Sequence, residues 1–299
     1  MQKRARSFAV ALSIAVLCLG ALPRAARAEA AEPSHEPEDL TLGNFFDGWN
    51  QAWTHRHGDT PDMALLKVAT NFLERELRLD YARTDTRNNR KVSAIDFGNA
   101  LIAYGLNRRL MVSVVTNYQW NEGFKGAPAN GGGGGAVLRL QLVDTAAWSW
   151  AVQARVSPAD RGVGQTQTSY TYALAGWTDL HALIPVLTRT GLYWSAQFEN
   201  LQGSHAPGLR ENDVSYDVSL AKTWTEATTP VLANLTTFVE AFGTTDLDGA
   251  GEGKTVATLT PGVRFWFVPE NSLMFGVDVP VSHGAPLAAV YRATYILNF

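Results

Sequence analysis

The sequence predicts an all-β protein, a transmembrane antiparallel β-barrel of about twelve strands preceded by a short N-terminal helical segment. Three observations lead to this fold class. The chain begins with a pattern typical of export. Beyond about residue 70 its hydrophobicity alternates with a period of two, and it ends on an aromatic residue, Phe299. No later apolar run is long enough for a membrane helix, whereas barrel strands alternate and escape such a search.

Residues 1–28 have the three parts of a secretory signal peptide. A basic start, which includes Lys3 and Arg4, is followed by an apolar run from Phe8 to Leu22 and by the cleavage motif Ala26-Arg27-Ala28. Cleavage after Ala30 is an alternative. Cys18 is the only cysteine of the chain and leaves with this peptide, so we expect no disulfide, thiol nucleophile or cysteine-bound metal in the mature chain.

The charge of the mature chain argues against nucleic-acid binding. The signal peptide carries five basic and no acidic residues, which leaves 20 Lys and Arg against 28 Asp and Glu, a net charge of −8. Nucleic-acid-binding proteins present a basic face instead. The glycine run Gly131–Gly135 reads as a flexible loop and not as a phosphate-binding loop, because no Lys-Ser/Thr pair follows it. We therefore expect no cofactor.

Residues 29–68 are expected to form an N-terminal periplasmic or plug segment. An acidic, proline-containing lead is followed by Phe45, Trp49 and Trp53 at helical spacing, with Asn44 as a possible cap. The motif Thr60-Pro61-Asp62 reads as a second helix start. These two short helices could anchor the chain at the periplasmic mouth or plug the lumen.

A possible metal motif in the same region is weak. His55-Arg56-His57 with Asp59 offers two imidazoles but no defined third ligand, so we expect a polar turn and no metal.

Residues 69–299 are expected to form the barrel. In the last segment, Tyr291, Tyr295 and Phe299 share one face, and Arg292 and Thr294 share the other. Twelve segments of this kind occur, at about 72–83, 91–105, 109–120, 136–144, 147–157, 167–177, 188–200, 212–224, 230–242, 254–267, 272–280 and 288–299.

The links between these segments alternate in length. Those after odd-numbered segments are mostly long and polar, as at 121–135 and 243–253, and those after even-numbered segments are mostly tight, as at 106–108 and 144–146. Outer-membrane barrels have this asymmetry. The link 178–186 is an exception, because it is long for a periplasmic turn.

The polar faces of the strands supply candidate lumen residues. In a soluble sandwich, which is the alternative fold, their charges would be solvated surface. In a barrel they point inward, and the selectivity candidates are Glu74, Glu76, Arg78, Asp80, Arg139, Arg155, Asp217, Glu240, Arg264 and Arg292, with Asp278 assigned to the same interior.

Aromatic residues near the strand ends favour the barrel. Trp148, Trp177, Trp224 and Phe267 fall near the tight turns, and Tyr118, Trp120, Tyr170, Phe198 and Phe242 near the long loops. Two such belts are expected at the membrane interfaces. The chain end, with Tyr291, Tyr295, Leu297 and Phe299, is similar to the C-terminal signal that the barrel assembly machinery reads in outer-membrane proteins.

The mature chain resembles a family of outer-membrane proteins linked by context to a phenol meta-cleavage pathway and often labelled transporters. The resemblance rests on Asn71–Tyr81 (NFLERELRLDY), the alternating strands and Phe299. It implies passive uptake or efflux of a small molecule, hydrophobic molecules included. The link to phenol is one of pathway context and assigns no substrate.

The leading hypothesis is a monomeric, passive, porin-like channel in Gram-negative outer-membrane lipid, inserted by the assembly machinery, for a small solute that the sequence does not identify. One alternative is a structural or partner-binding barrel with a closed lumen. Another is a lipid hydrolase, for which His181, His205 and His283 are the candidate bases. None of them lies near a membrane-facing Ser in a predicted strand, so we expect no enzyme.

Overall fold

The computed structural model describes residues 38–54, 60–86, 91–96, 102–122, 131–159, 167–203, 211–282 and 287–299. The chain divides into two compact units, Met1–Glu38 and Asp39–Phe299, and the second is considered below. The signal peptide and the motif around His55 lie outside the described residues, as do His205 and His283. Within the described ranges, no helix has the length and apolar character needed to cross a membrane.

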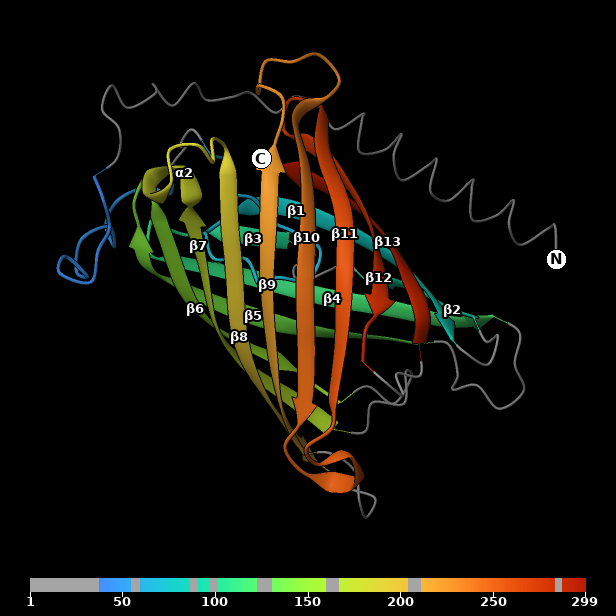
Figure 1. Cartoon of the computed structure of the whole chain (residues 1–299). Helices are drawn as coiled ribbons and strands as arrows, with labels where there is room; N and C mark the ends of the chain where they lie inside the picture. Colours follow the sequence, from blue (N-terminus) through green and yellow to red (C-terminus); the bar gives the residue numbers. More distant parts are fainter. Residues whose placement is uncertain are drawn as a thin grey trace. The chain divides into compact units, whose positions relative to one another are not determined.

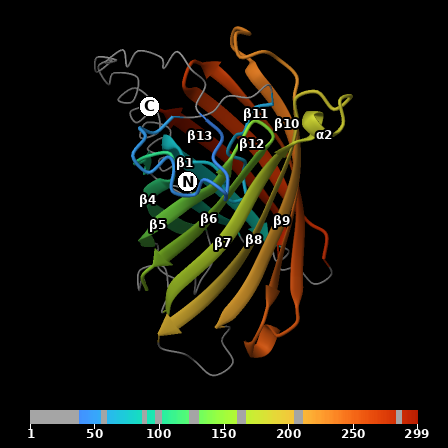
Figure 2. The same cartoon turned by 90° about the vertical axis from the view of Figure 1, so that its left-hand side faces the viewer.

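Residues 75–298 form a closed antiparallel β-barrel (Figures 1 and 2). The strands are β1 (Arg75–Thr86), β2 (Lys91–Asp96), β3 (Ile102–Gly105), β4 (Leu110–Glu122), β5 (Gly131–Asp144), β6 (Trp148–Ser157), β7 (Gln167–Asp179), β8 (Thr190–Gly203), β9 (Asn212–Thr223), β10 (Ala233–Asp246), β11 (Thr255–Val268), β12 (Asn271–Pro280) and β13 (Leu287–Asn298). The helix α2 (Leu180–Leu183) and the 3₁₀ turn η1 (Gly249–Gly251) lie in links.

The barrel has twelve strand positions, which confirms the predicted count. β2 and β3 both pair with β1 on one side and β4 on the other, so they occupy one position between them. The pairing of β1 with β13 closes the barrel, for example at Leu77 opposite Leu297. The tight links lie at one end, here called the short-turn end, together with α2 and the end of β13 (Figure 1). The opposite end is called the long-loop end.

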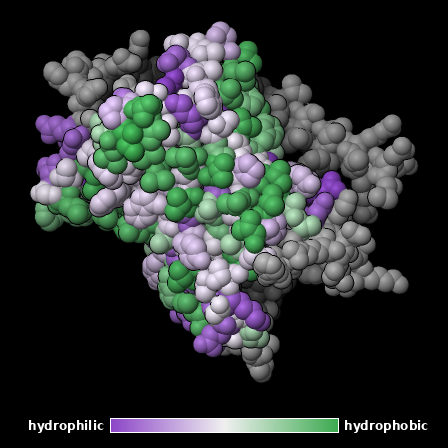
Figure 3. All heavy atoms as spheres, in the orientation of Figure 1, coloured by the Kyte–Doolittle hydropathy of each residue, from purple (hydrophilic) through white to green (hydrophobic). Residues whose placement is uncertain are grey.

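The two faces of the strands differ as the alternation predicts. Figure 3 shows patches of hydrophobic residues on the face of the molecule turned to the viewer. Large apolar side chains on the outer face of the strands are exposed. They are Val112, Val114, Leu138, Tyr172, Leu174, Phe198, Tyr216, Val218, Leu220, Val239, Leu259, Phe275, Val279 and Tyr291. Polar side chains on the alternate positions are buried, among them Arg139, Asp217 and Thr260. The barrel is therefore apolar outside and polar inside.

The glycine run, expected to be a loop, is the beginning of β5. Gly131–Gly135 pair with β4 in register, from Gln119 opposite Gly131 to Val115 opposite Gly135. Backbone groups alone make these ladder bonds, so a strand does not need side chains to pair. At Gly135 a Cβ atom would lie 2.4 Å from the carbonyl oxygen of Val156. A strand in this position therefore requires glycine there.

The expected N-terminal helices are wrong. Residues 43–50 form successive turns, with bonds of the i to i−3 type from Asp47 N to Asn44 O and from Gln51 N to Gly48 O. Gly48 has φ +84°, which ends any right-handed helix at that point. Residues 60–74 have neither helix nor strand, and the chain bends at residue 60, at residues 66–68 and at residue 72. Their backbone groups bond to the barrel wall instead of to one another, as described below.

Two of the expected belt aromatics point inward. Trp148 and Trp224 are exposed at the short-turn end, and Phe198 is exposed nearer the long-loop end. Trp177 is buried in an apolar cluster within the barrel, and the Nζ atom of Lys67 lies 4.1 Å from the centroid of the Phe242 ring. Trp177 and Phe242 both occupy inward-facing strand positions. Proximity to a strand end is therefore not sufficient to place an aromatic residue in an interfacial belt.

Candidate functional site

The chain before β1 lies inside the barrel. Residues 60–74, here called the lumen segment, place Met63, Leu65, Leu66 and Val68 among the most buried side chains of the protein. They pack against inward-facing wall residues in one cluster, which contains Trp177, Tyr193, Ala221, Phe238, Met274 and Ile296. Because these wall residues come from six strands around the barrel, the segment fills the lumen over this stretch.

Charged wall side chains hold the backbone of the lumen segment. Arg264 Nη1 donates to Ala64 O at 2.6 Å, and Arg78 Nη2 donates to Leu65 O at 3.0 Å. On the opposite side of the bend, Glu240 Oε1 accepts from the backbone N–H groups of Lys67 and Val68, both at 3.1 Å. The bonds donated by the two guanidinium groups are of the stronger, charge-assisted kind. Buried peptide groups that an extended segment leaves unpaired are thereby satisfied.

The two ends of the segment are also attached to the wall. At its start, Thr60 Oγ1 donates to Asp179 Oδ1 at 2.7 Å, and the hydroxyl of Tyr193 donates to Pro61 O at 2.9 Å. At its end, Arg139 Nη1 donates to Phe72 O at 2.6 Å and forms an ion pair with Glu74 at 3.1 Å. The segment is therefore fixed along its whole length.

Lys67 lies at the bend and points toward the long-loop end of the lumen. Its Nζ atom donates to Thr258 Oγ1 at 2.9 Å and lies 3.4 Å from Asp278 Oδ2, with the Phe242 ring beside it. Asp278 is shared, because Arg292 binds it at 2.9 Å and Thr260 donates to it. The bend thus ends in a network of paired charges.

Two glycines make room for this packing. A Cβ atom at Gly276 would lie 2.3 Å from Leu66 Cδ1, and one at Gly262 would lie 2.3 Å from Phe238 Cζ. A side chain at either position would have to displace its neighbour. Glycine at these two positions therefore allows the close packing inside the barrel.

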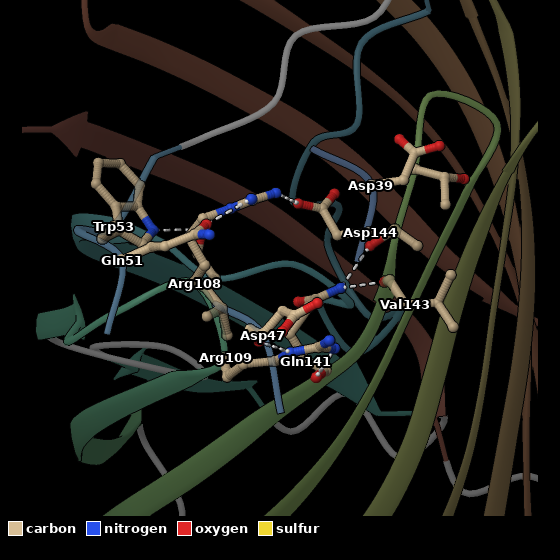
Figure 4. Close-up of polar contacts among 12 residues, drawn as sticks. Asp39, Asp47, Gln51, Trp53, Arg108, Arg109, Gln141, Val143 and Asp144 are labelled. Atoms are coloured by element: carbon tan, nitrogen blue, oxygen red, sulfur yellow. Dashed lines mark hydrogen bonds and ion pairs between the residues drawn. The ribbon is translucent and has the colours of Figure 1, made fainter. Parts of the chain in front are cut away.

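An N-terminal strap, residues 39–54, lies against the short-turn end of β4 and β5. Arg109 is fully buried, and its guanidinium donates to five backbone carbonyls, those of Thr41, Asn44, Asp47, Gln141 and Leu142. Arg108 contacts Gln51 at 2.8 Å and Asp144 at 3.7 Å. Figure 4 shows both arginines between the strap and the β5–β6 turn. Leu40 and Asp144 form an additional β-bridge.

One carboxyl group of the lumen segment is poorly compensated. Asp62 Oδ2 accepts from Asn71 Nδ2 at 2.9 Å, but the Asp62 Oδ1 atom is shielded from solvent without a hydrogen-bond partner. Burial raises the pKa of Asp62 well above its usual range, and the hydrogen bond from Asn71 acts in the opposite direction. The position therefore favours the neutral carboxyl.

Toward the long-loop end the lumen contains a polar cavity of about 370 Å³. It is bordered by β4 to β10, and its lining includes Arg155, Ser169, Thr171, Gln197, Glu199 and Asp213. The lumen thus has a filled half at the short-turn end and a hollow half at the long-loop end.

The structure places the selectivity candidates in three groups. Arg78, Arg139, Glu240 and Arg264 bind the backbone of the lumen segment. Glu74, Glu76, Asp80, Asp217 and Arg292 also occupy inward positions, where Asp80 pairs with Arg78 at 3.0 Å and Asp217 accepts from Ser195 at 2.5 Å. Of the whole set, Arg155 lines the cavity.

Sequence reasoning missed Asp62, Lys67 and Arg109. Lys67 lies in no strand and carries no periodic signal, and Arg109 precedes β4 by one residue. Paired arginines in a tight turn were the one visible hint. His181, a candidate catalytic base, lies in α2 outside the cavity, and within the described residues no three His, Cys, Asp or Glu side chains gather as a metal site.

Comparisons with known proteins support the fold. No family model and no curated protein matches the chain in sequence. The crystal structure of the COG4313 outer membrane channel from Pseudomonas putida F1 is similar with a TM-score of 0.51 and 12% identity, over 78% of this chain and 97% of that one. The NanC porin is similar with a TM-score of 0.47 and 10% identity, over 75% of this chain and 98% of that one. The KdgM porin is similar with a TM-score of 0.44 and 10% identity, over 75% of this chain and 99% of that one. At these identities the likeness concerns the barrel alone.

Proposed function

We propose that the protein is an outer-membrane channel for small polar solutes, closed at its periplasmic end by the lumen segment and opened when that segment moves. The observation that carries the proposal is the position of residues 63–68, which lie inside the barrel and yet belong to no strand. A wall built from paired strands can stay intact while such a segment shifts. The resemblance to the phenol-pathway family remains a prediction and assigns no solute.

The location in the proposal follows from the two faces of the barrel. An apolar outer face with exposed side chains such as Val218 and Phe275 suits lipid, and a buried polar inner face suits a lumen. The signal peptide at 1–28 and the aromatic chain end support export and insertion by the assembly machinery. We place the short-turn end in the periplasm, and we treat the barrel as a monomer in outer-membrane lipid.

The attachment of the segment sets how often the channel would be open. Full burial of a Leu, Val or Met side chain contributes about 1.5–3 kcal/mol, and a hydrogen bond to a charged group about 1.5–3 kcal/mol. Several contacts of each kind hold residues 63–68. The closed state is therefore expected to dominate, with rare openings in the unmodified protein.

Conductance in planar bilayers tests the proposal. Purified protein should give few steps, and Glu240→Ala should raise the open probability by about tenfold or more, because two buried backbone N–H groups lose their acceptor. Asp217→Asn is the matched control. It removes an inward carboxylate whose hydrogen bond comes from Ser195 and not from the lumen segment, and it should leave the open probability close to that of the unmodified protein.

A disulfide lock separates a moving segment from a leaking wall. Leu66→Cys with Gly276→Cys, added to Glu240→Ala, joins two positions in close contact. Steps should vanish on oxidation and return on reduction, and the single-cysteine variants should conduct under both conditions. If Glu240→Ala never conducts although the barrel is folded, the channel is refuted. The closed-lumen, ligand-binding barrel, which the firm attachment of the segment favours, would then stand.

A further inference from the structure

The cavity at the long-loop end has opposite charges on two parts of its wall. Arg155 extends from β6, whereas Glu199 and Asp213 extend from β8 and β9. Hydroxyl groups of Ser169 and Thr171 on β7 lie between them. The cavity volume of about 370 Å³ falls within the range of small-molecule sites.

Strand register puts these groups in one row across the wall. Arg155 is opposite Thr171, Thr171 is opposite Glu199, and Glu199 is opposite Asp213. Neighbouring strands are about 4.8 Å apart, so the backbones of Arg155 and Glu199 are separated by about 10 Å. The positive and the negative group therefore face one space at the same depth in the lumen.

The guanidinium of Arg155 has capacity for a ligand. Its Nε atom donates to Ser157 Oγ at 3.0 Å, and no ion pair joins it to a carboxylate among the residues that the structure describes. The Nη groups of Arg155 are the two donors that suit a carboxylate in a bidentate arrangement. Glu199 is held in place by Ser169, whose Oγ donates to its Oε1 at 2.5 Å.

The charges select among ligand classes. A simple anion would meet Glu199 and Asp213 on one wall, and a simple cation would meet Arg155 on the other. A molecule with a carboxylate at one end and an ammonium group at the other satisfies both walls. We propose that this cavity binds small zwitterions of the amino-acid class, with Arg155 at the carboxylate and Glu199 at the ammonium group. This inference deepens the proposed function, since the cavity would be the outer vestibule of the channel.

Binding of a matched series tests the inference on the purified full-length barrel in detergent micelles. The probes are 4-aminobutanoate, butanoate and butylammonium, which share a chain length and differ in charge. Calorimetry or saturation-transfer NMR should show 4-aminobutanoate binding about tenfold or more tighter than either other probe. Arg155→Gln and Glu199→Gln should each remove this preference, whereas Arg83→Gln, on the outer face of β1, should retain it.

Equal binding of the three probes, or an unchanged preference in Arg155→Gln with the barrel shown to be folded, would overturn the inference. Loss of the preference in Arg83→Gln as well would also overturn it, because the effect would then not belong to the cavity. Binding of the probes is measured at equilibrium on the closed barrel. Conductance is measured in a separate experiment without 4-aminobutanoate. The zwitterion site and the channel can therefore fail separately.

Discussion

Several buried polar side chains of the barrel wall form hydrogen bonds with peptide groups of the lumen segment. Arg264 and Arg78 each donate to a carbonyl of the lumen segment, and Glu240 accepts from two of its N–H groups. An unpaired peptide group in this position would cost several kcal/mol, and so would an unpaired charge. The residues that alternation marks as selectivity candidates thus act first as attachments of a segment without regular structure.

Asp62 should make the attachment of this segment depend on pH. Its site favours the neutral carboxyl, so the pKa is higher in the occluded state than in water. The free energy that keeps the lumen segment in place is therefore greatest at acidic pH. It decreases as the pH rises through the pKa that Asp62 has in the occluded state. In Leu66→Cys, maleimide labelling should accelerate with pH relative to an exposed reference cysteine from Val186→Cys. Adding Asp62→Asn should abolish that trend, and a trend that persists would exclude Asp62 as its cause.

Arg109 should control the strap in the same way that charges control the lumen segment. Arg109→Ala leaves five carbonyls without their donor, and a loss of about 3 kcal/mol or more in local stability is expected. Hydrogen exchange over residues 41–51 should rise, while the β8–β11 strands remain protected. Arg83→Ala, whose ion pair with Asp85 spans 3.6 Å and is partly exposed, should change neither region. Unchanged exchange in Arg109→Ala would show that packing alone holds the strap.

At the scale of elements, the sequence predicts the strands far better than the chain before them. Each strand has one face toward an apolar and one toward a polar environment, so its alternation is visible locally, and the observed bounds differ from the predicted ones by a few residues. The lumen segment has no such constraint. Leu65, Leu66 and Val68 are buried on several sides at once, and their apolar contacts in the cluster are made with strands more than a hundred residues away.

The helical reading of residues 44–53 failed for a related reason. Phe45, Trp49 and Trp53 have helical spacing, but the strap obtains its backbone partners from Arg109 and from the bridge at Leu40. Gly48 at positive φ then reverses the chain. Spacing alone does not distinguish a helix from turns whose carbonyls are bound by a distant guanidinium. In the sequence, the adjacent Arg108 and Arg109 were the one sign that this segment is bound by side chains of the barrel.

The start of β5 gives a prediction for a single element. A Cβ atom at Gly135 would lie 2.4 Å from Val156 O, so Gly135→Val should disturb the β5–β6 pairing and reduce the folded fraction seen as a heat-dependent shift in gel mobility. Gly134→Val is the matched control, because the nearest atom there is Val115 O at an ordinary 3.4 Å. Equal folding of the two variants would mean that β5 can move to accept a side chain.

At the scale of the molecule, closure and occlusion depend on each other. Twelve strands lie between the number that side chains can fill and the number that leaves a wide channel. Here wall side chains and the lumen segment together fill the short-turn half, and the cavity remains in the other half. The segment is continuous with β1, which pairs with β13. The strand that closes the barrel is thus also the one that carries the occluding segment.

The last residue offers a test of how this closure is reached. Phe299 donates its N–H to Arg75 O at 3.0 Å, and its side chain is more than half exposed, so it contributes little packing to the finished barrel. Its value is expected during insertion, when the end of β13 would be read by the assembly machinery. Phe299→Ala should therefore reduce the amount of folded barrel in outer membranes severalfold. The purified, refolded variant should keep a thermal midpoint close to that of the unmodified protein, as should the control Tyr172→Ala, which removes an exposed outer-face aromatic outside the chain end. If the refolded Phe299→Ala barrel were itself unstable, the residue would be structural, and a role in assembly would no longer follow.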